Sequence, residues 1–500
     1  ILWLLSQIIM LFLNIIWGVT LKYHFFIGRT DILFHSWLVE NLLKTGHINQ
    51  VFDVYEAFPL FHILSSVVFQ VCNLSISPNK VMYLINGFVF AGLLIIIYLL
   101  VNKITNTKVA LLASLFACFN PDVIFYGMYS IPRSVVFFLE GLLIYLFMQK
   151  KDYANLVLLS IVTIGIIVFH TASMPYIISI LAFFYLLQRL CKIERNSYLV
   201  ELNFLLLLSI ATISYWMFFG VSVFRSLVGS LFSQALTGIL TKSIVETPLK
   251  ELFNYLQYSP LLFFLIAGVL GVLSVKQFKE ISVLFCLMAL FLVPVTFPGP
   301  ALLLNKLAGN LNLNRFGEYS FLFISIAGAA GLYILFSNFK KASKFGVLAL
   351  FLLMAFLSVS NDFTASDNPL AKRPFYTFYL EQQEIVAFTS LAEITTGHLM
   401  SDYITCRYLD NSIYAPKMHV LETDGLKQRF LRSDDKDILL VRRMELSKRP
   451  LKLYAVPGEE FVFDPNLSDA MEYFPSDLSL WDTLESYNTI YDSGAVVAFN

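Results

Sequence analysis

Long hydrophobic runs separated by short polar breaks fill the first 360 residues of the chain. A helix needs about 20 mostly apolar residues to cross about 30 Å of hydrocarbon, and eleven runs reach or approach that length. The transmembrane helices predicted from these runs lie at residues 1–19, 81–102, 107–120, 131–149, 153–169, 172–188, 198–220, 258–275, 281–298, 317–337 and 345–360. The pattern therefore predicts a polytopic α-helical membrane protein with about 11 transmembrane helices.

The pattern changes after residue 360, where apolar runs become short and polar residues become frequent. An amphipathic helix is predicted at residues 381–396, and short strands are predicted at residues 438–441, 453–456 and 495–499. We therefore expect a transmembrane domain at residues 1–360, followed by a soluble mixed α/β domain at residues 361–500.

The apolar segment at residues 58–72 decides the topology, because it is short and opens with Phe-Pro. We expect it to lie along or dip into the outer surface. The short loops that carry 12 of the 22 basic residues of the membrane part then all face the cytoplasm. The N-terminus is cytoplasmic in this arrangement, and the first loop, residues 19–80, and the C-terminal domain lie outside the cell membrane. If the segment crosses, residues 19–57 face the cytoplasm instead.

Composition agrees with a chain that sits in lipid, because 57% of its residues are apolar and only 14% are charged. Residues 1–360 hold 22 Lys and Arg against 13 Asp and Glu, whereas residues 361–500 hold 13 against 22. The acidic C-terminal part argues against nucleic acid as a partner. The five cysteines show no spacing typical of a zinc site or a disulfide framework.

The first outer loop holds the densest group of residues that could carry chemistry. Asp31 and His35 are four residues apart and would share one face of a helix, and Asp53 and Glu56 follow in the same loop. A carboxylate beside an imidazole suits general-base work or metal binding. The alternative is an amphipathic surface helix whose polar face is only solvated.

Two later stretches place arginine beside carboxylates near predicted helix ends. Asp122 and Arg133 lie in a short outer loop, where Arg133 could bind a phosphate or extend its charged group to the membrane surface. Arg315 and Glu318 open a late span and could pair with each other, or Arg315 could bind the phosphate of a lipid-linked substrate. Glu140 lies deeper in a predicted span and is expected to be structural or to line a substrate path.

The order of these features resembles the GT-C class of membrane glycosyltransferases, which includes oligosaccharyltransferase catalytic subunits and protein O-mannosyltransferases. A first span is followed by a long outer loop with an early acidic residue, Asp31, and then by the aromatic-Pro-Leu segment FPL of residues 58–60. A second outer loop carries Pro132, Arg133 and Ser134, and a late span opens with Arg315.

The resemblance implies an inverting glycosyltransferase that takes sugar from a polyprenyl-phosphate donor and glycosylates an extracytoplasmic glycan, lipid or protein. It implies that Asp31 is the catalytic base or a metal ligand and that Arg315 contacts the donor phosphate. A Mg²⁺ or Mn²⁺ ion on Asp31 and Asp122 is one option and metal independence is the other, because the paired acidic motif of the second outer loop is reduced here to Asp122. The Trp-Trp-Asp motif of oligosaccharyltransferases is also missing, since the only Trp-Asp is Trp481-Asp482.

Two other functions stay open. The chain could be a transporter or flippase of a lipid-linked or small polar substrate, for which Glu140 is the supporting residue. It could also be a non-catalytic assembly protein of the cell envelope whose acidic C-terminal part binds partners. Membrane lipids are expected partners in every case.

Overall fold

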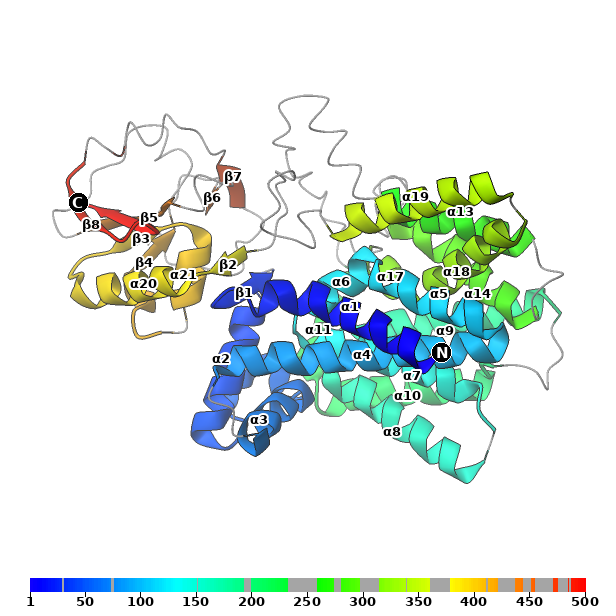
Figure 1. Cartoon of the computed structure of the whole chain (residues 1–500). Coiled ribbons are helices and arrows are strands. Elements are labelled where there is room, and N and C mark those ends of the chain that lie inside the picture. The colour runs from blue at the N-terminus through cyan, green and yellow to red at the C-terminus, as the bar shows by residue number, and fades with distance from the viewer. Residues whose placement is uncertain are drawn as a thin grey trace. The chain divides into compact units, whose positions relative to one another are not determined.

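A computed structural model of the chain shows two compact units (Figure 1). The structure describes residues 1–28, 31–72, 76–150, 152–192, 199–232, 259–273, 280–296, 314–338, 340–359, 378–410, 412–420, 437–443, 451–454, 471–474, 484 and 487–500. The helical unit takes the described residues of 1–19, 38–238 and 255–364, and the C-terminal unit takes those of 20–37 and 365–500.

The helical unit contains a helix over each of the eleven predicted transmembrane segments. These helices are α1 (Leu2–Thr20), α4 (Pro78–Ile104), α5 (Thr107–Cys118), α7 (Pro132–Phe147), α8 (Tyr153–Phe169), α9 (Ser173–Leu190), α10 (Leu202–Phe218), α13 (Ser259–Leu273), α14 (Glu280–Leu292), α18 (Phe321–Asn338) and α19 (Lys341–Val359). Shorter helices lie between them, namely α3 (Leu60–Cys72), α6 (Pro121–Met128), α11 (Val221–Phe232), α17 (Asn314–Glu318) and the 3-10 helices η1 (Gln50–Glu56) and η4 (Val293–Thr296).

Length and hydropathy support fewer certain spans than the sequence predicts. Among the described residues, four helices are long and apolar enough to cross a membrane alone, or up to six if each of two bent pairs forms one span. Five further apolar helices are shorter, with 10–17 residues. The chain is therefore an integral membrane protein, and the count of about 11 spans stays a prediction.

The segment at residues 58–72 is helical, as predicted, over α3. It follows η1 with a bend of 117° between the two helices. Such a sharp bend is typical of a broken span or a re-entrant loop. Whether the segment crosses the membrane therefore stays a prediction.

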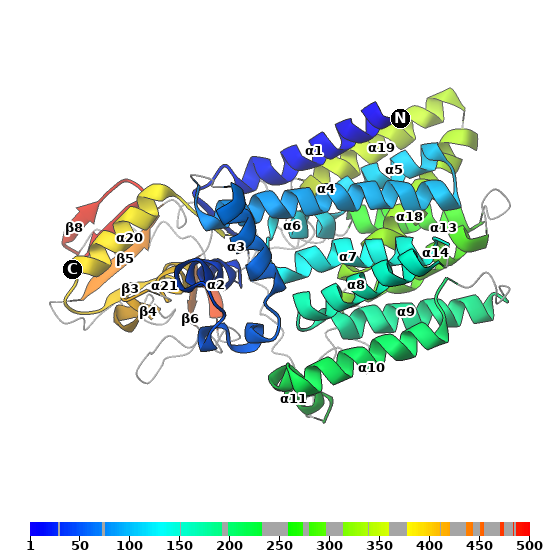
Figure 2. The same ribbon diagram turned by 90° about the horizontal axis from the view of Figure 1, so that it is seen from below.

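The helices of the first unit pack as a bundle around α4, α7 and α18 (Figure 2). Helix α4 packs on α5 and α7, α7 packs on α8, and α18 packs on α5, α13 and α14. Small residues permit the closest of these contacts, because a Cβ atom added at Gly331 of α18 would collide with the backbone carbonyl of Ala267 in α13. This is the usual way for membrane helices to gain contact area.

The C-terminal unit is a mixed α/β domain, as the sequence predicts. Its main sheet has the strand order β4-β3-β5-β9-β8, with β3 parallel to β4 and β5, and β9 antiparallel to β5 and β8. The strands are β3 (Leu399–Ser401), β4 (Met418–Val420), β5 (Ile438–Arg442), β8 (Thr489–Asp492) and β9 (Val496–Phe499), and a separate pair comprises β6 (Leu451–Tyr454) and β7 (Met471–Phe474). Helices α20 (Gln382–Ile394) and α21 (Tyr403–Leu409) and the short η5 (Ala415–Lys417) complete it.

A two-stranded sheet within the same unit joins two segments that are about 350 residues apart in the sequence. Strand β1 (Phe25–Gly28) pairs antiparallel with β2 (Phe378–Leu380), which leads into α20. Helix α2 (Asp31–Thr45) follows β1, and its first seven residues belong to the C-terminal unit while the rest belong to the helical unit.

Candidate functional site

Arg133 is the centre of a polar cluster at the start of α7. Pro132 occupies the first turn of this helix, where its missing N–H costs nothing, and this fixes Arg133 near the helix end. One terminal nitrogen of the guanidinium donates to the Tyr126 hydroxyl and to a Glu318 carboxylate oxygen, both at 3.0 Å. The Arg133 side chain is 13% exposed, and its buried Nε has no hydrogen-bond partner in the described structure.

Side chains of Asn86 and Asn120 hold the backbone of α6, which carries Tyr126. The Asn86 amide of α4 donates to the carbonyl oxygens of Tyr126 and Gly127 at 2.7 and 2.8 Å. Asn120 caps α6, because its side-chain oxygen accepts from the backbone N–H of Asp122 at 2.9 Å. These contacts fix the partner of Arg133 before any ligand binds.

Arg315 lies beside the same cluster on α17, and its environment differs from that of Arg133. Its guanidinium lies close to the phenol of Tyr176 on α9. The Tyr176 ring packs against Phe316 and Tyr319, with centroid distances of 5.0 and 5.9 Å. Glu318 pairs with Arg133, so the local Arg315 to Glu318 pair considered from the sequence is not formed; across the described ion pairs, no carboxylate faces Arg315.

A short hydrogen-bonded chain anchors α17 to the start of α9. The buried Tyr319 hydroxyl donates to the Ser173 hydroxyl oxygen at 2.6 Å. The same Ser173 oxygen lies 2.6 Å from Nδ1 of the buried His170. Because Tyr319 follows Glu318 directly, this chain restrains the position of the carboxylate that Arg133 binds.

Asp122 and Glu318 line one narrow crevice between α4, α6, α7, α17 and α18, which has no room for a water molecule. Their remaining neighbours in this crevice are apolar: Phe90, Leu93, Val123, Phe137 and Phe321. Within the ranges that the structure describes, no three His, Cys, Asp or Glu side chains gather closely enough to hold a metal ion. No step below is assigned to a metal.

Asp31 and His35 belong to the C-terminal unit and do not share one environment. Asp31 is exposed at the first residue of α2, whereas His35, one turn later, is 2% exposed. The helix predicted for this pair is present. The exposed carboxylate is available to a substrate, and the buried imidazole is part of the core.

Asp53 and Glu56 lie on η1 of the helical unit, and both are exposed. Asp53 has φ +45° and ψ −120°, a backbone conformation that a non-glycine residue rarely adopts. Residues held in such conformations occur often at functional sites, so Asp53 remains a candidate substrate-binding residue.

Glu140 is buried in α7, seven residues after Arg133 and so on the same helix face. Its side chain is 1% exposed, and neither carboxylate oxygen has a hydrogen-bond partner in the part of the chain that the structure describes. An unpartnered carboxyl group at this depth is costly and is a functional candidate by default.

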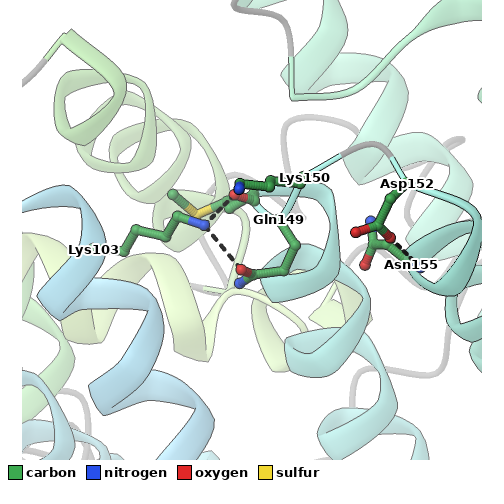
Figure 3. A pocket seen from close by; sticks show the side chains of 6 residues that line it. Lys103, Gln149, Lys150, Asp152 and Asn155 are labelled. Atoms are coloured by element: carbon green, nitrogen blue, oxygen red, sulfur yellow. Dashed lines mark hydrogen bonds between the residues drawn. The ribbon is translucent and has the colours of Figure 1, made fainter.

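A cavity lies at the opposite end of α7, about 22 Å away at 1.5 Å per helical residue. Lys103, Met148, Gln149, Lys150, Asp152 and Asn155 line it (Figure 3), and its volume is about 460 Å³. The Lys103 ammonium donates to the Met148 carbonyl and, at 3.0 Å, to the Gln149 side chain. These bonds fasten the end of α4 to the end of α7, at loops predicted to be cytoplasmic.

Sequence reasoning missed the tyrosines and the serine of the cluster. Tyr126, Tyr319 and the pair of Ser173 and Tyr176 come from three separate segments, and none of them stands in a motif. Tyrosine is common in this chain, with 25 examples, so composition could not single these out. Trp481-Asp482 lies outside the described residues.

Comparison with known proteins shows similarity in fold and none in sequence. No family model matches the chain, and no curated protein matches it in sequence. The oligosaccharyltransferase of Archaeoglobus fulgidus in its apo form matches with a TM-score of 0.56 and 12% identity, over 89% of this chain and 70% of that one.

Two further structures of that enzyme match over 89% of this chain and 69% of theirs. One carries a tethered acceptor peptide with an NVT sequon, and its TM-score is 0.51 at 13% identity. The other, named AglB, is in complex with an inhibitory peptide and a dolichol-phosphate, and its TM-score is 0.53 at 11% identity. The predicted resemblance to GT-C membrane glycosyltransferases is thus confirmed at the level of the fold.

Proposed function

We propose that this protein is an integral-membrane glycosyltransferase that takes a sugar from a polyprenyl-phosphate donor and transfers it to an extracytoplasmic glycan, lipid or protein. The fold supports the general class, because an oligosaccharyltransferase with this fold has been described with a dolichol-phosphate and with an acceptor peptide. Sequence similarity is too low to carry the substrate over. The proposal therefore depends on the site.

The observation that carries the proposal is the difference between the two arginines of the cluster. Glu318 already neutralises Arg133 at 3.0 Å, whereas none of the described ion pairs includes Arg315, which lies beside the uncharged Tyr176. A guanidinium without a carboxylate partner can form two parallel hydrogen bonds to a phosphate. Arg315 is therefore the residue that we assign to the donor phosphate.

The proposed reaction is a single displacement at the anomeric carbon of the sugar. Asp31 takes the proton of the acceptor nucleophile, which attacks the anomeric carbon while the bond to the phosphate oxygen breaks. The polyprenyl phosphate leaves with the bonding electron pair, and Arg315 stabilises the charge that accumulates on it. One displacement inverts the anomeric configuration.

Binding of undecaprenyl phosphate to the purified protein in nanodiscs tests the role of Arg315. Loss of a charge-assisted hydrogen bond costs about 1.5–3 kcal/mol, so Arg315→Gln is expected to raise the Kd about 10- to 150-fold. Arg189→Gln is the matched control, because Arg189 is an exposed arginine at the far end of α9. Equal binding by the two variants would remove the assignment of Arg315.

Transfer of radiolabelled sugar from a panel of polyprenyl-phosphate hexoses tests the role of Asp31. Asp31→Asn keeps the size of the side chain but cannot accept a proton at neutral pH, so transfer should fall by a factor of about 100 to 10,000. Binding of undecaprenyl phosphate should stay at the wild-type level. Near-normal transfer by Asp31→Asn would show that another group is the base.

Labelling of two native cysteines can test the proposed orientation in the membrane. Cys72 and Cys191 are exposed, whereas Cys118, Cys286 and Cys406 are buried. With the N-terminus in the cytoplasm, Cys72 lies on the outer side and Cys191 on the cytoplasmic side. A membrane-impermeant maleimide should label Cys72 in intact cells, and it should label Cys191 only after permeabilisation. The reverse result would invert the topology.

A transporter or flippase is the second candidate, and Glu140 is the observation that favours it. A buried carboxyl group with unpartnered oxygens can exchange a proton or bind a cation during transport. Glu140→Gln should then abolish flux of a lipid-linked substrate across proteoliposomes. If the protein transfers sugar instead, this variant should keep most of its transfer activity.

A further inference from the structure

The segment that leads to Asp31 is part of the C-terminal unit. Strand β1 pairs with β2 through the partners Phe25 with Leu380 and Phe26 with Tyr379 (Figure 1). More than 350 positions separate these partners along the chain. The pairing therefore costs considerable loop-closure entropy and persists only because other contacts stabilise it.

Aromatic stacking supplies part of that stabilisation. The rings of Tyr23 and Tyr379 stack with centroids 3.7 Å apart and an angle of 19° between their planes. Phe25 meets the edge of Tyr408 on α21 at 6.4 Å. Tyr23, Phe25 and Tyr379 are each at most 7% exposed, so the β1 side of this contact is core and not surface.

A buried arginine fixes β2 to the rest of the domain. Arg442, at the end of β5, donates to the Tyr379 carbonyl oxygen at 3.1 Å. Its guanidinium also binds the carboxylates of Glu384 on α20 and Asp402 at the start of α21, at 3.1 and 3.4 Å. Arg442 is 1% exposed. Arg442 thus connects β2, at the residue that stacks on Tyr23, to β5, α20 and α21.

Asp31 stands only three residues beyond the end of β1. Gly28, the last residue of β1, has φ +62°, a conformation that glycine adopts without strain, and it turns the chain out of the sheet. Helix α2 then begins at Asp31, and the next two residues, Ile32 and Leu33, are buried. Only two residues separate β1 from Asp31, so the backbone at the start of α2 must lie close to the end of β1.

We propose that the C-terminal domain positions the catalytic carboxylate, and that Tyr379 and Arg442 are the positioning residues. This inference rests on the proposed function for the role of Asp31. The path runs from Arg442 to the backbone of Tyr379, through the stack on Tyr23 and the β1 to β2 pairing, to the first residue of α2. A change in the C-terminal domain would then alter the sugar-transfer step without altering donor binding.

Amide hydrogen exchange of the full-length protein in nanodiscs tests the mechanical part of the inference. Tyr379→Ala removes the ring that β2 contributes to the stack. Tyr23→Ala removes the other ring, which belongs to a residue outside the main sheet of the domain. Exchange in residues 23–37 should rise about tenfold in both variants, as expected for a lost aromatic contact with the burial that accompanies it. Exchange in β5 and β9 should stay at the wild-type rate, which shows that the domain remains folded.

Ile413→Ala is the matched control in this experiment, because Ile413 is 85% exposed in the same domain. It should leave exchange in residues 23–37 unchanged. The inference is overturned if residues 23–37 exchange at the wild-type rate in Tyr23→Ala and Tyr379→Ala while β5 and β9 remain protected.

Steady-state kinetics test the functional part. Tyr379→Ala should lower kcat about tenfold and leave the KM for the donor unchanged, since donor binding depends on the helical unit. Tyr379→Phe keeps the stacked ring and should restore kcat. A fall in kcat that Tyr379→Phe fails to restore, or an unchanged kcat despite faster exchange, overturns the positioning role. A wild-type protein that transfers no sugar contradicts the proposed function instead, and hydrogen exchange still decides whether β2 holds the segment of Asp31.

Discussion

Two arginines, a half-buried one in the helical unit and a fully buried one in the C-terminal unit, are surrounded in different ways. Arg442 of the C-terminal unit meets two carboxylates and a backbone carbonyl, and it is 1% exposed. Arg133 of the helical unit meets one carboxylate and one phenol, and its Nε has no partner among the described residues. Arg315 lies nearby, beside the Tyr176 phenol. Each of the three nitrogens of the Arg442 guanidinium has a hydrogen-bond partner, whereas Nε of Arg133 has none among the described residues.

This difference separates a structural role from a ligand-binding role. A guanidinium has five N–H donors, and a buried donor that bonds nothing costs about 1–3 kcal/mol. A site that leaves such donors open gains more from an incoming anion than a site whose donors are already satisfied. We therefore assign Arg442 to the fold and the pair of Arg133 and Arg315 to the substrate.

The largest expected effect is on the stability of the C-terminal unit. Arg442→Gln leaves Glu384 and Asp402 buried without their cation, which typically costs about 3–5 kcal/mol in free energy of unfolding. Limited proteolysis across a urea series should show this unit cleaved at a lower urea concentration than in the wild type.

Arg443→Gln is the control for that prediction, since Arg443 is the next residue and forms an exposed ion pair with Asp492 at 3.1 Å. Exposed pairs contribute at most about 1 kcal/mol, so its midpoint should hardly move. Equal shifts for the two variants would mean that the Arg442 cluster is not the structural centre of the domain.

A smaller effect is expected at the open cluster. Glu318→Gln removes the only carboxylate that pairs with Arg133 in the described structure, and we expect a loss of about 1–3 kcal/mol. Undecaprenyl phosphate should raise the melting temperature of Glu318→Gln more than that of the wild type, because its phosphate supplies the missing negative charge. Thermal unfolding with and without the lipid measures both shifts. An equal or smaller rise would argue that the phosphate does not reach the cluster.

The smallest effect concerns a histidine pair in the C-terminal unit. His398 and His419 stack with centroids 4.1 Å apart. Burial first, and then the neighbouring His398, lower the pKa of His419, while Asp437 opposes this shift. The unfolded chain therefore takes up a proton near pH 6.5 that the folded domain resists, so stability should fall as the pH drops through that value.

His419→Gln should remove part of that acid sensitivity and change little at pH 8. Urea midpoints of the C-terminal unit at pH 8 and pH 5.5 provide the measurement. A wild-type midpoint that rises on acidification would show that the sign of the pKa shift is wrong.

The sequence predicts the fold well where the signal is local. Apolar runs of nearly span length locate the helices, and alternation locates β5 and β9, because burial within lipid or within a sheet leaves a periodic pattern. Pairing between β1 and β2 leaves no such pattern. Phe25 to Gly28 is too short a run to indicate a strand, and its partner strand lies about 350 residues later in the sequence.

The sequence also predicts the charged residues of the site, but not the contacts between them. Charged residues are rare in the membrane part, so Arg133, Arg315 and Glu318 attract notice by composition alone. Which of these residues pair with one another is decided by the tertiary structure. Spacing suggests that Glu318 would pair with Arg315 three residues away, but the fold brings Arg133 of α7 closer. The exposure of Asp31 and the burial of His35 also depend on contacts that the spacing does not contain.

The most direct test of the central claim is a cryo-EM map of the purified protein with undecaprenyl phosphate. We predict phosphate density within hydrogen-bonding distance of the Arg315 guanidinium, on the side of Tyr176 and Arg133. Phosphate density at mid-membrane beside Glu140, with nothing at Arg315, would contradict the account and favour transport.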